Sequence, residues 1–152
     1  WIDLSKGLGC PIGGVLTGSM GFIEEAWYWK QRLGGAMRQS GMMAAAGLFA
    51  LENNVSRLEE DHRNAQILGE RLADIDGIDI NVGNIETNLI FFKVKTLNIN
   101  AIQLSERLLE EGIRIGAMGE KDIRVVTHLD VDRAGVLEAA DAIASILVSN
   151  SN

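Results

Sequence analysis

Several residue types are scarce in this sequence, and each scarcity excludes a class of protein. The single cysteine, Cys10, excludes an internal disulfide framework and suits a reducing, cytoplasmic compartment. The single proline, Pro11, leaves no proline-rich linker between domains. No cysteine and histidine cluster has the spacing of a metal site, and no nucleophile elbow is present. We therefore expect neither a bound metal nor a serine hydrolase.

Positive charge and long apolar runs are scarce as well. Lys and Arg number 14 against 21 Asp and Glu, and the resulting net charge of −7 disfavours nucleic acid or an anionic membrane as a general partner. A local basic pocket for a small anion remains compatible with that balance. The longest apolar run, residues 42–51, is too short to cross a bilayer and predicts a helix that is buried on every side.

What the sequence does contain is typical of one globular domain with a hydrophobic core. Its 152 residues are 47% hydrophobic and 23% charged, which excludes intrinsic disorder. The chain opens on Trp1 and reaches its most informative motif five residues later. From this start we expect a chain that begins in mid-domain.

That motif is a lysine in a glycine-rich turn, between apolar runs at residues 1–4 and 15–17. Four glycines lie between residues 7 and 14 and let the backbone pass close to a bulky group. Ser5 immediately precedes Lys6. If Lys6 lies at the edge of a buried sheet, burial lowers its pKa and gives a neutral amine suited to a Schiff base with a carbonyl or with pyridoxal phosphate (PLP). A solvated surface lysine is the alternative.

The first part of the chain is expected to contain two short strands, one helix and then a very long helix. The strands are predicted at residues 1–4 and 14–18, and Ser19 is a plausible N-cap for the first helix. Gly34 and Gly35 end that helix, and a long helical stretch is predicted from 36 to 74. Within it, Asn53-Asn54 marks a change of burial and is a candidate position for a kink. The second half of that stretch is amphipathic, with an apolar stripe formed by Val55, Leu58, His62, Ala65, Leu68, Leu72 and Ile75.

The last part of the chain predicts a β-β-α-β-β-α module. Its strands are expected at 78–82, 88–94, 113–117 and 123–128. Asn100 and Gln103 form a capping-box pattern for a helix that ends at Gly112, and Asp130 or Asp132 caps a final helix that runs to Val148. We therefore divide the α/β chain into residues 1–52, a connecting helix at 53–76, and a small domain at 77–149. The first piece is too small to close a core alone.

Two further cationic positions are candidates for anion binding. Residues 29–41 carry Lys30, Arg32 and Arg38 near a helix start, where a phosphate can bind; solvated cations at a helix junction are the alternative. Alternation in the strand at 123–128 puts Arg124 on the same face as Val126 and His128. Arg124 could bind a carboxylate there or form a cross-strand salt bridge. His62 and Cys10 are expected to be packed residues.

Several motifs together resemble the low-specificity L-threonine aldolases. They are LSKGLGCPIG at residues 4–13, LGGAMRQSG at 33–41, AAAG at 44–47, EDH with NA at 60–65, TN at 87–88 and RVVTHLDV at 124–131. The resemblance extends over essentially the whole chain, in order, and this combination is far more specific than any one motif.

The resemblance implies a fold type I PLP enzyme, of which this chain is the C-terminal part. It implies that Ser5 and Lys6 bind the cofactor, with Lys6 as the Schiff-base lysine, and that Arg124 binds the substrate carboxylate. Arg38 would lie near the cofactor phosphate and reach it from a neighbouring subunit of a homo-oligomer. The implied reaction is retro-aldol cleavage of L-threonine or L-allo-threonine to glycine and an aldehyde.

The sequence also departs from the family pattern. Gln31 stands where many members carry a lysine, and the upstream phosphate loop, ring-stacking histidine and pyridinium-binding aspartate are not in this chain. We therefore expect the 152-residue chain alone to be inactive. The alternatives are another PLP reaction on the same fold, such as hydroxymethyl transfer or β-elimination, and a non-catalytic assembly module.

Overall fold

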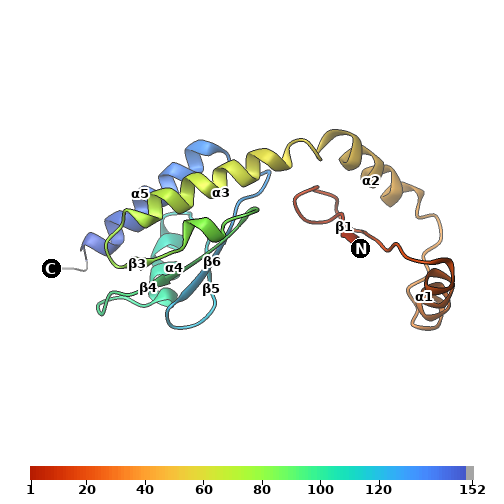
Figure 1. Cartoon of the computed structure of the whole chain (residues 1–152), viewed down its shortest axis with the longest axis horizontal. Helices are drawn as coiled ribbons and strands as arrows, with labels where there is room; N and C mark the ends of the chain where they lie inside the picture. Colours follow the sequence, from red (N-terminus) through yellow and green to blue (C-terminus); the bar gives the residue numbers. More distant parts are fainter. Residues whose placement is uncertain (150–152) are drawn as a thin grey trace. The chain divides into compact units, whose positions relative to one another are not determined.

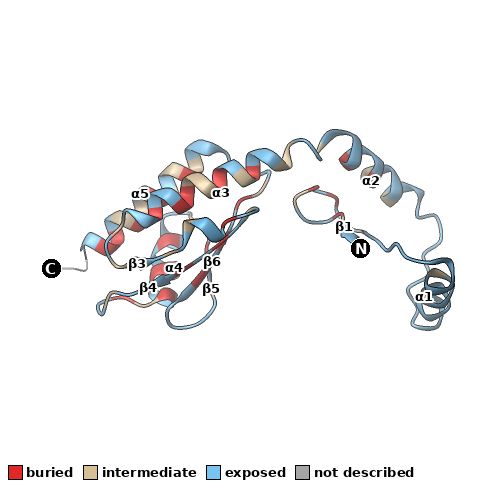
Figure 2. Ribbon diagram, in the orientation of Figure 1, coloured by how far each residue is buried: buried red, intermediate tan, exposed pale blue. Residues whose placement is uncertain are grey.

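The computed structural model describes residues 1–149, and these form two compact units. The first unit spans residues 1–58 and the second begins at Glu59. Buried residues are concentrated in the second unit, whereas the first has few (Figure 2). The predicted division at residues 52 and 76 stays a prediction, although the helix of its middle segment packs within the second unit. None of the described helices has the length and apolar character needed to span a membrane.

The first unit contains a two-stranded antiparallel sheet and two helices (Figure 1). Its elements are β1 (Ile2–Asp3), β2 (Gly14–Val15), α1 (Met20–Arg32) and α2 (Gly41–Asn53). Ser19 caps α1 as predicted, because its hydroxyl accepts a hydrogen bond from the Phe22 amide. Gly34, whose φ of 75° lies in the left-handed region, ends the helix as expected.

The long helical stretch predicted from 36 to 74 is two separate helices, and the break begins at the candidate kink, Asn53-Asn54. Helix α2 ends at Asn53, a turn follows, and α3 (Leu58–Ala73) begins after it. The side chain of Asn53 donates to the Phe49 carbonyl, and that of Asn54 donates to the Leu8 carbonyl at 2.8 Å. Asparagine side chains that bond to nearby backbone groups compete with the helical hydrogen bonds, which explains the break.

The prediction that residues 42–51 are buried on every side is wrong. Only Gly47 and Ala50 of α2 are buried, whereas the side chains of Met42 and Phe49 are more than half exposed. The buried side of α2 packs on the turn that follows β1: a Cβ on Gly47 would lie 3.2 Å from the Leu4 Cδ1. Residues 1–58 contain no second layer that could cover the other faces of this apolar helix.

The second unit is a four-stranded antiparallel sheet with three helices (Figure 1). In chain order it contains α3, β3 (Ile78–Asp79), a 3₁₀ turn (Val82–Asn84), β4 (Leu89–Val94), α4 (Ala101–Glu110), β5 (Gly116–Ala117), β6 (Asp122–Val126) and α5 (Arg133–Ser149). The strand order is β3-β4-β6-β5. The predicted β-β-α-β-β-α sequence is confirmed, although β3 and β5 are shorter than predicted.

One face of this sheet is covered and the other is open. Alternate residues of β4 and β6 are buried, and they join apolar residues of α3, α4 and α5 in a single core. The buried sheet residues are Ile90, Phe92, Val94, Ile123 and Val125. Because side chains alternate between the faces of a strand, the residues between them project from the open face.

The helix caps of the second unit follow from the sequence. Asn100 and Gln103 form the predicted capping box, in which each side chain accepts a hydrogen bond from the other residue's backbone amide. Gly112 ends α4 with a φ of 82°. Asp132, one of the two predicted caps of α5, accepts a hydrogen bond from the Gly135 amide at 2.9 Å. The sequence was sufficient to predict these helix ends, because each capping interaction joins residues only three or four positions apart.

Polar groups join the C-terminal end of β6 to α3. The buried Thr127 hydroxyl donates to the Asp61 carbonyl at 2.6 Å, and the Asn88 side chain donates to the Thr127 carbonyl at 2.8 Å. Sequence analysis placed His62 on the buried stripe of this helix, but His62 is only half-buried, and its neighbour Asp61 is 1% exposed.

Replacing Thr127 tests this connection. Thr127→Val keeps the side-chain shape but removes the hydroxyl that donates to the Asp61 carbonyl, so we expect a loss of about 0.5–1.5 kcal/mol in the free energy of unfolding. Urea denaturation followed by circular dichroism measures the change. Thr127→Ser retains the hydroxyl and is the control. Equal stability of the Val variant and the wild type would contradict this role for the hydroxyl.

Candidate active site

The loop that carries Lys6 is closed by backbone hydrogen bonds. The Leu4 amide donates to the Gly13 carbonyl at 2.9 Å, and the Cys10 amide donates to the Leu4 carbonyl at 3.0 Å. Within the loop, Gly9 has a φ of 75° and Gly13 a φ of 132°, backbone conformations that favour glycine. The glycines noted in the sequence therefore shape the loop itself.

A carboxylate holds the two predicted cofactor-binding residues of this loop together. Asp3 accepts a hydrogen bond of 2.7 Å from the Ser5 hydroxyl and forms an ion pair of 3.0 Å with the Lys6 amine. The Ser5 hydroxyl, the Lys6 ammonium and the Ser5 amide together lower the pKa of Asp3 from 3.8 to about 2. Sequence reasoning missed Asp3, although an acid two residues before a serine is a recognised turn signature.

The expected burial of the Lys6 amine is not found in this unit. The Lys6 side chain is 74% exposed, whereas Leu4, Leu8 and Cys10 of the same loop are buried together with Ala50. The apolar side chains of the loop turn toward α2, and the lysine turns toward the solvent and Asp3. Cys10 is a packed residue, as predicted, and its thiol contacts the Ala46 carbonyl at 3.5 Å.

Arg38 lies in the segment between α1 and α2. Its side chain is exposed and forms no ion pair or hydrogen bond with residues 1–58. The next residue, Gln39, has a φ of 51°, which is unusual for a residue other than glycine. This strained turn presents Arg38 three residues before the first residue of α2, in the segment where the sequence suggested a phosphate site. Its proposed role in cofactor binding stays a prediction.

Arg124 projects from the open face of the second unit's sheet. In β6 it lies between the buried residues Ile123 and Val125, and its partners in the neighbouring strands are Phe91 and Gly116. The alternative of a cross-strand salt bridge is not found, because no carboxylate within residues 59–149 pairs with Arg124. The cross-strand ion pair of this face joins Lys93 and Asp122 at 3.7 Å.

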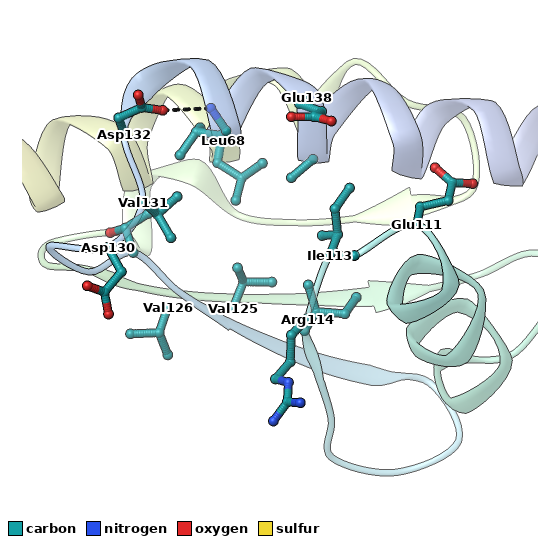
Figure 3. A pocket seen from close by; sticks show the side chains of 16 residues that line it. Leu68, Glu111, Ile113, Arg114, Val125, Val126, Asp130, Val131, Asp132 and Glu138 are labelled. Carbon is teal, nitrogen blue, oxygen red and sulfur yellow. Dashed lines mark hydrogen bonds between the residues drawn. The ribbon is translucent and has the colours of Figure 1, made fainter.

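A separate pocket of about 300 Å³ lies at the edge of the sheet between β6 and α5 (Figure 3). It is lined by apolar residues, including Leu68 and Val136, with several acids at its rim. One of these acids, Asp132, is already used as the cap of α5. None of the predicted site residues lines this pocket, so it supplies no part of the candidate site.

Residues 1–95 match the family model of the beta-eliminating lyases. The chain belongs to this family. The matched segment contains the Lys6 loop and Arg38, whereas Arg124 lies beyond it.

Curated relatives are similar over most of the chain. It is 45% identical over 139 residues to the low-specificity L-threonine aldolase of Escherichia coli K12, a match that covers 91% of this chain and 40% of the relative. It is 41% identical over 136 residues to low-specificity L-threonine aldolase 1 of Arabidopsis thaliana, covering 89% of this chain and 38% of that protein. The chain therefore spans about two fifths of the length of these relatives, and the predicted resemblance is confirmed.

Solved structures confirm the predicted fold class. A Listeria monocytogenes protein described as an L-allo-threonine aldolase superposes with a TM-score of 0.70 at 20% identity, covering 95% of this chain and 43% of that one. The 8-amino-7-oxononanoate synthase of Francisella tularensis gives a TM-score of 0.67 at 18% identity, covering 99% and 47%. At these identities the likeness shows the fold alone, which is that of fold type I PLP enzymes.

The carboxylate that holds Ser5 and Lys6 gives a pH prediction. The folded pKa of Asp3 is lowered, so the stability that this group contributes is complete above its unfolded value near 4 and is lost as the pH falls through about 2. Because the Ser5 hydroxyl is the largest contributor, Ser5→Ala should move the Asp3 midpoint toward 3.8. Carboxyl-carbon NMR titration measures it. Ser40→Ala removes a serine without a side-chain capping bond and should leave the midpoint unchanged.

Proposed function

We propose that this chain supplies part of the active site of a PLP-dependent L-threonine aldolase, which cleaves L-threonine or L-allo-threonine to glycine and an aldehyde. The observation that carries this proposal is the 45% identity to a low-specificity L-threonine aldolase over 139 residues. It is supported by a lysine placed with a serine hydroxyl on one closed, glycine-rich loop.

The groups on this loop fit the proposed cofactor. Lys6 offers an exposed primary amine that is paired with the Asp3 carboxylate. The Ser5 hydroxyl donates a hydrogen bond to the same carboxylate. Arg38 offers a guanidinium without an ionic partner in residues 1–58, which suits a phosphate. When bound, PLP supplies an electron sink for the carbanion that forms as the Cα–Cβ bond breaks. Asp3 keeps the Lys6 amine near the loop backbone until the cofactor is in place.

Arg124 is proposed to bind the α-carboxylate of the amino acid. The guanidinium can donate two parallel hydrogen bonds to a carboxylate, and the open sheet face leaves it accessible. The neighbouring strand β4 restricts the side-chain conformations of Arg124, because Phe91 is the residue directly opposite it. Binding the carboxylate there would orient the bond to be broken and exclude substrates without a free acid group.

We propose further that the complete enzyme is a cytoplasmic homo-oligomer with Arg38 near a neighbouring subunit's site. The exposed apolar side chains of the first unit support this, since Trp27, Tyr28 and Met42 are all more than half exposed. Large apolar patches of this kind usually lie in contact with other protein. The 152-residue chain alone is proposed to be inactive, because Lys6 is not enclosed within residues 1–58.

β-Elimination is the second candidate reaction, and the description of the matched family favours it. Both reactions would use Lys6 and Arg124 in the same way and differ in the bond of the substrate that breaks. Product analysis with the full translation product separates the two. Glycine with acetaldehyde from threonine supports the aldolase, whereas ammonia with a 2-oxo acid supports elimination.

Lys6 is tested by covalent trapping in the full translation product. Borohydride reduction after addition of PLP should attach one cofactor per chain to the peptide that contains Lys6, and glycine release from threonine should fall at least about 1,000-fold in Lys6→Ala. Lys30→Ala removes a lysine of the same unit and is the control. Label on another lysine, or full activity of Lys6→Ala, would refute the assignment. The 152-residue chain should release no glycine.

Arg124 is tested by the affinity for substrate. Loss of a charge-assisted pair costs about 1.5–3 kcal/mol, so Arg124→Gln should raise the KM for threonine by about 10- to 100-fold. Steady-state kinetics of the full translation product measure this. Lys93→Gln removes a positive charge from the same sheet face and should change KM by less than about threefold. An unchanged KM in Arg124→Gln would exclude Arg124 from carboxylate binding.

A further inference from the structure

A second arginine lines the hollow that contains Arg124. This hollow, of about 390 Å³, lies on the open face of the sheet at β5 and β6. Arg114 and Arg124 are the charged residues that line it, and its other lining residues are glycine and apolar residues. Arg114 also borders the pocket between β6 and α5. Arg114 was not singled out from the sequence, because it precedes β5 in a segment with no recognisable site motif.

The strand register brings the two arginines onto one face. Gly116 pairs with Arg124, and Arg114 lies two residues before Gly116. Arg114 is exposed, Ile115 is buried and Gly116 is exposed, which is the alternation of a strand with one open face. Figure 3 shows the Arg114 side chain on the side of the sheet away from α5. Arg114 and Arg124 are therefore diagonal neighbours, within reach of long side chains.

Glycine at position 116 keeps the space between them open. It stands directly opposite Arg124 and contributes no side chain to the hollow. A Cβ there would lie 3.3 Å from the Arg124 carbonyl, which is tight for a carbon contact. A larger residue at this position would occupy the floor of the hollow and separate the two guanidinium groups.

The charges of the hollow are not neutralised by the protein. Within residues 59–149 no carboxylate forms an ion pair with Arg114 or Arg124, whereas Lys93 on the same face is paired with Asp122. Two neighbouring like charges on a sheet face destabilise it, and an anion between them relieves that repulsion. The chain has a net charge of −7, so two neighbouring arginines without a carboxylate partner in residues 59–149 are unexpected.

We propose that Arg114 and Arg124 form a two-guanidinium site for a ligand with two carboxylates. The inference rests on the proposed function: Arg124 binds the α-carboxylate, and Arg114 binds a second acid group on the substrate side chain. The substrate class is then a β-hydroxy amino acid whose β-carbon bears a carboxylate. Its cleavage breaks the Cα–Cβ bond, and the hydroxyl-bearing carbon leaves as a 2-oxo acid with an aldehyde group while the other carbons leave as glycine.

The test compares two ligands of the same shape on the 152-residue chain. Succinate has two charges, and its half-amide, succinamate, has one. At constant ionic strength, arginine side-chain NMR signals should show succinate binding about fivefold more tightly, a ratio typical of one added exposed ion pair. In Arg114→Gln the ratio should fall to about one, because the second carboxylate of succinate then has no cationic partner in the hollow. Arg114→Lys, which keeps the charge, should retain part of the preference.

Lys93→Gln is the matched control, since it removes a positive charge from the same face but not from the hollow, and it should keep the fivefold ratio. Backbone NMR spectra establish that each variant is folded. The proposal is overturned if succinate does not bind, if wild type shows no preference, or if Arg114→Gln retains it. The succinate assay needs no PLP, so it is independent of the borohydride trapping of Lys6. If trapping fails but the preference for succinate over succinamate is found, the aldolase proposal is refuted and the dicarboxylate site is retained.

Discussion

Burial of a single face of the sheet is the constraint on which the second unit depends. Alternate residues of β4 and β6 pack against three helices in one core, and a slip of one residue in register would exchange the two faces. Core packing thereby fixes the position of Arg124, because its neighbours in the strand, Ile123 and Val125, must point inward. The Thr127 hydroxyl adds a polar anchor at the end of β6. The candidate anion site is a consequence of how the core is filled.

The two units differ in how much of their apolar surface they bury. The second has nineteen buried residues in one hydrophobic cluster, while the buried cluster of the first consists of Leu4, Leu8, Cys10 and Ala50. The first unit is nevertheless ordered locally by short-range interactions, including the Ser19 cap and the bonds that close the Lys6 loop. A few buried residues therefore hold the Lys6 loop in shape, even though most of α1 and α2 is exposed.

The outcome of the sequence predictions follows from the range of the interactions involved. The caps at Asn100 and Asp132 and the helix end at Gly112 could be predicted, because each is decided within one turn of helix. The break between α2 and α3 was predicted only as a candidate kink at Asn53-Asn54, because the bond from Asn54 to Leu8 joins residues 46 positions apart. The bond from Thr127 to the Asp61 carbonyl likewise joins residues 66 positions apart.

By itself, the sequence determined the family resemblance, the order and type of the elements apart from the separation of α2 from α3, and the identity of Lys6, Arg38 and Arg124 as candidate site residues. These follow from local periodicity and from motifs that need no spatial information. The local contact of Asp3 with Ser5 and Lys6 was missed by sequence reasoning, although it spans only three residues. Only the tertiary structure decided that the lysine is exposed and that Arg114 shares a hollow with Arg124. Those facts depend on strand register and on which side chains the core admits, and neither is encoded within a few neighbouring residues.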